Sequence, residues 1–98
     1  MYKALDKHLP LALHVLRAIA HPLRFRIVCM AAEKQPLPVQ NIYDELKITP
    51  AIASQHLRIL KNAGILHGYR KHRHVYYAIN RQFMLRFCDS LAKYFSSP

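Results

Sequence analysis

A helix with a marked start and a marked end, followed at once by a hairpin pattern, constrains the fold of this chain most. Thr49 and Pro50 are typical of a helix start, because a threonine hydroxyl can accept a free backbone N–H and a proline fits the first helical turn. Apolar residues then recur at helical spacing between residues 53 and 60. Gly64 follows and suits the left-handed conformation at a helix end. The pattern predicts a helix over residues 50–62.

Two short segments rich in β-branched and aromatic residues come next, at residues 65–69 and 74–79. Such segments favour strands, and the cationic residues 70–73 between them predict the turn of a hairpin. The tip contains no glycine, so the hairpin needs either a longer loop or a non-glycine residue with positive φ. A helix followed by a charged hairpin is typical of a winged helix.

The rest of the chain shows helical periodicity that proline divides into short pieces. These patterns predict helices over residues 10–20, 22–33, 38–46 and 81–95. The prolines expected in the first turns of these helices are Pro10, Pro22 and Pro38. The short step from the third helix to Thr49 is typical of a helix-turn-helix, and Asn80 is the expected cap of the last helix.

The element order is therefore four helices, two strands and a final helix, which is a mainly α fold with a small β-hairpin. A chain of 98 residues is long enough for one domain, predicted here to span residues 1–98. Within it, the helix-turn-helix is expected at residues 38–62 and the wing at residues 65–79. The fold class predicted is a winged helix-turn-helix.

The charge is distributed unevenly along the chain. Its formal net charge is +10, and no carboxylate occurs between Glu45 and Asp89, although that stretch holds eight Lys or Arg residues. Such a surface suits a polyanion, because neutralised phosphates release counterions. An enzyme is not expected: acidic residues are few, and the two glycines form no phosphate-binding loop. The charge distribution predicts a partner with phosphate groups.

Two further patterns concern the location of the protein. The apolar run at residues 9–16 is too short for a membrane span. His14 and Arg17 interrupt the apolar pattern, so a signal peptide is not predicted either. Cys29 and Cys88 cannot form a disulfide framework, and both fall in apolar helical patterns that predict buried thiols. The sequence predicts a cytoplasmic protein with no membrane partner.

The first and last helices carry more apolar surface than one small core easily covers. This surplus predicts a homodimer formed through residues 10–20 and 81–95. In the alternative, the same residues fill the core of a monomer. The predicted interface residues are Leu11, Val15, Phe83, Phe87, Leu91, Tyr94 and Phe95.

Three parts of the sequence resemble the ArsR/SmtB family of winged-helix repressors. They are LRAIAHPLRFRIV at residues 16–28, SQHLRILKNAGIL at residues 54–66 and VYY at residues 75–77. The resemblance covers residues 10–95. It implies a dimeric repressor that binds an imperfect inverted repeat and releases the DNA when an inducer binds.

The resemblance places the helix at residues 50–62 in the major groove and the hairpin on the flanking backbone or minor groove. Base contacts are expected from the exposed polar face of that helix, at Ser54, Gln55 and Arg58. The residues expected on the backbone or in the minor groove are Thr49, Lys61, Arg70, Lys71 and Arg73. His56 falls on the apolar flank of the helix and is expected to have a structural role.

The same resemblance leaves the inducer open. Family metal sensors commonly have a Cys-x-Cys at the start of the third helix, where this chain has residues 37–42 without cysteine. A second family site, on the last helix, aligns with residues that are not plausible ligands, so neither a metal at the usual sites nor a cofactor is predicted. Some relatives sense oxidants or sulfur compounds through paired cysteines, and Cys29 matches the first of them. Two alternatives therefore remain: a thiol-based redox or sulfur sensor using Cys29, and a winged-helix module that binds protein.

Overall fold

The computed structural model describes the backbone of residues 2–96 and the side chains of residues 11–96. In chain order its elements are α1 (Tyr2–Ile19), α2 (Pro22–Glu33), β1 (Leu37–Pro38), α3 (Val39–Leu46), α4 (Pro50–Asn62), β2 (Leu66–Lys71), β3 (His74–Ile79) and α5 (Arg81–Ser96). The strands form one antiparallel sheet in the order β1-β3-β2. The chain therefore folds as a winged helix-turn-helix, and the predicted fold class is confirmed.

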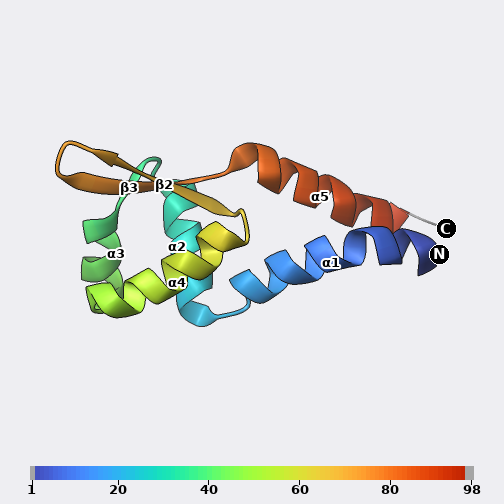
Figure 1. Ribbon diagram of the computed structural model, residues 1–98, viewed down its shortest axis with the longest axis horizontal. Coiled ribbons are helices and arrows are strands. Elements are labelled where there is room, and N and C mark those ends of the chain that lie inside the picture. Colours follow the sequence, from blue (N-terminus) through green and yellow to red (C-terminus); the bar gives the residue numbers. More distant parts are fainter. Residues whose placement is uncertain (1, 97–98) are drawn as a thin grey trace.

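The molecule is elongated, with extents of 49 × 22 × 19 Å. Helices α2, α3 and α4 lie together on one side of the sheet, whereas α1 and α5 pack against each other and extend away from it (Figure 1). The chain thus consists of a body that carries the helix-turn-helix and the hairpin, and an arm made of its first and last helices.

Two predicted boundaries differ from the structure by more than one residue. Helix α1 begins at Tyr2 rather than at residue 10, so Pro10 lies inside the helix instead of in its first turn. Good helix formers before it, among them Ala4 and Leu5, favour this extension. Strand β2 runs to Lys71, two residues further than expected. The ends of the predicted domain, residues 1 and 97–98, lie outside the described residues.

The third strand was not predicted. Leu37 pairs with Tyr77 and Pro38 pairs with Tyr76, which places a two-residue strand at the edge of the hairpin. Pro38 is consequently the residue that precedes α3, with extended backbone angles, and not a residue of its first turn. A proline is compatible with this position because an edge strand can spare one N–H.

The core lies where α1, α2, α4 and the sheet meet. Its largest fully buried side chains are Val15, Ile27, Leu37, Ile42, Leu60 and Ile65. Burial of such side chains contributes about 1.5–3 kcal/mol each, so this cluster holds the helix-turn-helix against the sheet.

Candidate nucleic-acid interface

Helix α4 is held at both ends by the residues that the sequence predicts. The Ile52 backbone N–H donates to Thr49 Oγ1 at 3.3 Å, so threonine caps the helix start. Gly64 has φ of +86° at the other end. Between these ends Ala53, Leu57 and Leu60 are buried, which fixes the side of the helix that faces the core.

The opposite side of α4 faces solvent and carries the predicted contact residues. Ser54, Gln55, Arg58 and Lys61 are all exposed, and Ser54, Arg58 and Lys61 make no hydrogen bond or ion pair with another described side chain that would occupy them. Since uncharged hydrogen-bonding groups lie beside two cations on one helix face, this face can contact both base edges and phosphates. We call these four residues the α4 polar face.

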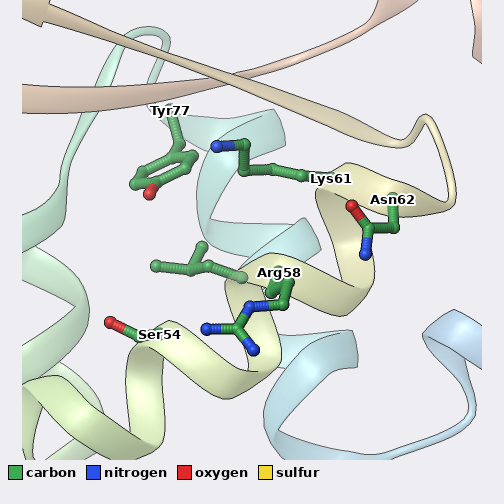
Figure 2. A pocket seen from close by; sticks show the side chains of 6 residues that line it. Ser54, Arg58, Lys61, Asn62 and Tyr77 are labelled. Atoms are coloured by element: carbon green, nitrogen blue, oxygen red, sulfur yellow. The ribbon is translucent and has the colours of Figure 1, made fainter.

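A depression of about 240 Å³ lies between the α4 polar face and strand β3. Figure 2 shows Tyr77 across from Ser54, Arg58, Lys61 and Asn62 in this depression. Burial raises the pKa of the Tyr77 hydroxyl, and Tyr43 raises it further, so the hydroxyl keeps its proton at neutral pH. Tyr77 can therefore donate a hydrogen bond at the edge of the helix.

Sequence reasoning missed Tyr77 as part of the site. Its position follows from the sheet register, in which Gly68 pairs directly with Tyr77. A Cβ added at Gly68 would lie 2.7 Å from Tyr77 Cε1, which is far inside van der Waals contact. The glycine in an otherwise aromatic and cationic strand was the available signal, because it marks a close approach of another group.

The wing ends in a two-residue turn. Lys71 pairs with His74, and His72 between them has φ of +59°. Of the two solutions expected for a tip without glycine, the molecule adopts the positive φ rather than the longer loop. His72 thus stands in the left-handed region that glycine usually occupies.

Arg70, Lys71 and Arg73 are all exposed on the wing. They do not form one cluster, because successive strand residues point to opposite faces of a sheet. Arg70 and Lys71 are consecutive residues of β2, so their side chains lie on different sides of the hairpin. The wing can therefore approach a phosphate backbone with either face.

A junction around Arg24 connects α4 to the helices behind it. The Arg24 guanidinium donates from Nε to the Ala18 carbonyl oxygen at 2.6 Å and from Nη2 to the Arg17 carbonyl oxygen at 3.4 Å. Its Nη1 lies 3.3 Å from His56 Nδ1 on α4. One side chain thus binds carbonyl groups in the last turn of α1 and a residue of α4. We call α4 the reading helix from here on.

Two histidines complete this junction. His21 Nδ1 accepts the Leu23 backbone N–H at 3.1 Å and so caps α2, and the His21 ring lies 4.5 Å from the His56 ring. Burial lowers the pKa of His56, and His21 and Arg24 lower it further. Both acceptor roles need an unprotonated Nδ1, so the junction is intact with neutral rings. The structural role expected for His56 agrees with these contacts.

The predicted dimer surface is partly exposed and partly not. Phe95 is 87% exposed, whereas Leu11, Phe83, Leu91 and Tyr94 are half-buried against the core. Val15 and Phe87 are 0% and 5% exposed within the single chain, so in this conformation they are not available to a second copy. They support the arm from inside, while other apolar residues of α1 and α5 face solvent, namely Leu13, Leu16 and Leu85.

The prediction that both cysteines are buried was wrong. Cys29 and Cys88 are exposed free thiols. On α2 the buried residues are Ile27, Met30 and Ala31, and Cys29 lies on the other side of the helix from Ile27.

Over the part of the chain that the structure describes, no group of three or more His, Cys, Asp or Glu residues is placed to hold a metal ion. In the same part, none of the helices combines the length and the apolar character that a membrane span requires.

A capped reading helix with an exposed polar face, a preceding helix across a short turn and a basic hairpin define a winged helix-turn-helix protein. Residues 21–67 match the family model described as "Bacterial regulatory protein, arsR family". The chain is therefore similar to this ArsR family over its helix-turn-helix and the start of its hairpin.

Individual relatives support this similarity to the ArsR family. The chain is 42% identical over 65 residues to the HTH-type transcriptional repressor SmtB of Mycobacterium tuberculosis, a match that covers 66% of this chain and 47% of that protein. It therefore spans about half the length of this curated relative.

Solved structures share the fold. HlyU from Vibrio vulnificus, a transcriptional regulator, superposes with a TM-score of 0.72 at 27% identity, covering 92% of this chain and 96% of that one. A domain from Mycobacterium bovis, described as a homodimeric winged helix-turn-helix DNA-binding domain, has a TM-score of 0.69 at 24% identity, with coverage of 91% and 88%.

Proposed function

We propose that this protein is a sequence-specific transcriptional regulator that binds double-stranded DNA as a homodimer and acts as a repressor at an inverted-repeat operator. The observation that carries the proposal is the α4 polar face, exposed beside a basic wing in a stretch of sequence without carboxylates. The match of residues 21–67 to the ArsR family model and the similarity to SmtB support it. A cytoplasmic location, where such DNA is found, is part of the proposal.

In the proposed complex α4 enters the major groove. Ser54, Gln55 and Arg58 contact base edges, since glutamine pairs with adenine and arginine with guanine in bidentate geometry. Lys61 and Thr49 at the two ends of the helix contact phosphates, and so do the wing cations Arg70, Lys71 and Arg73. The Tyr77 hydroxyl adds a donor at the edge of this surface.

A homodimer would bring two such surfaces to successive major grooves, about one helical turn apart. We place the interface on the arm, where α1 and α5 expose apolar side chains that include Leu16, Leu85 and Phe95. The homodimeric state of the Mycobacterium bovis domain supports this placement. Sedimentation at micromolar concentration tests it, and a single species of 11.5 kDa would contradict it.

Fluorescence anisotropy with labelled duplexes tests the DNA contacts. Arg58→Ala should cost about 1–3 kcal/mol on the preferred operator and relax the base preference, whereas Arg73→Ala should weaken binding to all duplexes alike. Lys93→Ala is the charge-matched control, because it removes one cation from the last turn of α5, on the arm. Equal losses for Arg58→Ala and Arg73→Ala on matched and scrambled duplexes would contradict this division of roles.

Salt dependence separates this proposal from the protein-binding alternative. Because the contacts are electrostatic, affinity for a duplex should fall steeply between 50 and 200 mM salt, the range over which about 6–10 phosphate contacts lose about 10³–10⁵ in affinity. Duplex binding that is absent at the lower salt concentration would favour a module that binds protein.

A thiol-based sensor is a second candidate, favoured by the exposure of Cys29 and Cys88. In this case oxidation by peroxide or polysulfide would release the operator, and Cys29→Ser would abolish the response. Mass spectrometry of the treated protein, combined with the anisotropy assay, tests this. An unmodified protein that stays bound to DNA would exclude it.

A further inference from the structure

The face of the sheet that points away from the helices carries an array of aromatic and cationic side chains. Directly paired residues of an antiparallel sheet point to the same face, and the pairs Tyr69 with Tyr76 and Lys71 with His74 therefore share one face with His67. The residues that alternate with them include Leu66, which is buried in the core. The first group thus faces outward, and we call it the outer face of the wing, made of His67, Tyr69, Lys71, His74 and Tyr76.

The rings on this face form a continuous series. His67 and Tyr69 are 6.4 Å apart between centroids with planes inclined by 28°, and Tyr69 and Tyr76 are 5.7 Å apart with planes inclined by 23°. His74 continues the series at 6.4 Å from Tyr76. Tyr69 is 41% exposed, so its ring is accessible to a ligand.

The charges on this face suit an anion. Lys71 lies within the array and Arg73 adjoins it at the tip, whereas Arg70 lies on the opposite face. No carboxylate occurs anywhere in the sequence between Glu45 and Asp89. A ligand with negative charges that run past a row of aromatic groups would be complementary to this arrangement.

A duplex does not fit this description fully, because the faces of its bases are covered by stacking inside the helix. In a single strand the faces of the bases are free, and sheets that combine exposed aromatic rings with cations bind such strands by stacking. The spacing of about 6 Å between successive rings also allows neighbouring nucleotides to contact neighbouring rings. We propose that the outer face of the wing binds a single-stranded nucleic acid segment, with bases stacked on Tyr69 and Tyr76 and phosphates held by Lys71.

This site is separate from the α4 polar face. Tyr77, which lines the depression beside α4, belongs to the other side of the sheet from Tyr69 and Tyr76. The inference therefore goes beyond duplex recognition, and the two proposed sites share only Lys71.

Titration of the full chain with an oligonucleotide of about eight nucleotides tests the proposal, at low salt and with oligo(dT) and oligo(rU) in parallel. Binding should quench tyrosine fluorescence, which is observable because the chain contains six tyrosines and no tryptophan to mask their emission. Comparison of the two oligonucleotides shows whether DNA or RNA is preferred.

Three substitutions at one position separate stacking from charge. Tyr69→Ile keeps a side chain that favours strands but removes the π face, and it should weaken oligonucleotide binding about 5- to 100-fold. Tyr69→Phe keeps the π face, so binding should persist with less tyrosine quenching. Tyr69→Ala should weaken single-strand binding while its affinity for duplex DNA stays unchanged.

The outcomes that overturn the proposal are equally defined. Absence of oligonucleotide binding at low salt would overturn it, and so would equal affinities of the wild type and Tyr69→Ile. Arg58→Ala provides the opposite case, since it should impair duplex recognition and leave single-strand binding intact. Failure of the duplex proposal would therefore be distinguishable from failure of this one.

Discussion

Gly68→Ala tests the packing of the wing against the reading helix. A Cβ at this position would lie 2.7 Å from Tyr77 Cε1, 3.2 Å from Cδ1 and 3.3 Å from Cζ. Carbon atoms pack at about 3.5 Å or more, so the ring must move by about 0.8 Å, which is the difference between about 3.5 Å and 2.7 Å. Leu37 is buried on the paired strand, whereas the depression lined by Leu57 and Lys61 of α4 leaves space beside the ring.

The expected cost follows from two opposing terms. Overpacking of a filled space costs about 1–3 kcal/mol, whereas replacing glycine restricts the unfolded chain and returns about 0.4–1 kcal/mol. The two ranges combine to a net loss in the free energy of unfolding of about 0–2.6 kcal/mol, with a midpoint of about 1.3 kcal/mol. For a domain of this size the midpoint corresponds to a decrease in Tm of about 5–10 °C.

Urea unfolding followed by circular dichroism, at one fixed protein concentration, measures this loss. The control is Gly68→Ala in a Tyr77→Ala background, where the ring is absent and the added methyl group should be neutral or stabilising. If Gly68→Ala costs the same free energy in both backgrounds, the contact with Tyr77 is not the reason for the glycine. Such a result would refute the reasoning.

Three further predictions concern α4 and its junctions. Thr49→Ala should lower the free energy of unfolding by about 0.5–2 kcal/mol through loss of the N-cap, as measured in urea, whereas Thr49→Ser should retain most of it. Gly64→Ala should also destabilise, because the residue has φ of +86° and an added Cβ would lie 3.1 Å from the Phe83 ring; a Tm equal to that of the wild type would contradict this. Burial lowers the pKa of His56 from 6.5, and the neighbouring His21 ring and Arg24 guanidinium lower it further, so the folded state favours the neutral ring. The contribution of His56 to the free energy of unfolding should therefore be fully present above pH 6.5. It should decrease as the pH falls from 6.5 through the lower folded-state pKa, and His56→Asn should show a smaller decrease in urea titrations.

The sequence predicted α4 and the hairpin well because their determinants are local. Thr49 and Gly64 act within one turn of the helix ends, and a short basic turn joins the two strand segments directly. Strand β1 could not be predicted in this way, since two residues become a strand only by pairing with β3 about forty positions later in the chain. The start of α1 was wrong for a different reason, because a helix interior can contain a proline when its neighbours favour helix.

The residues of the candidate site also differ in whether local sequence is sufficient to place them. Helical geometry was sufficient to place Ser54, Gln55 and Arg58 on an exposed face. It was insufficient for Tyr77, whose position depends on the register of three strands. The burial of Cys29 was predicted wrongly, because an apolar pattern alone does not show which side of a short helix faces the core.

The junction around Arg24 has a consequence for a dimer built on the arm. One guanidinium binds the end of α1 and contacts His56 on α4, so a single side chain helps to set the angle between the arm and the reading helix. The buried residues of α1 also pack on α2 and α4, so Arg24 acts together with the core in setting this angle. In a two-fold assembly the angle would affect the separation of the two α4 helices, and therefore which operator spacings can be read. Thermodynamic linkage then makes the effect reciprocal: an operator that favours one angle strengthens the subunit interface that shares it.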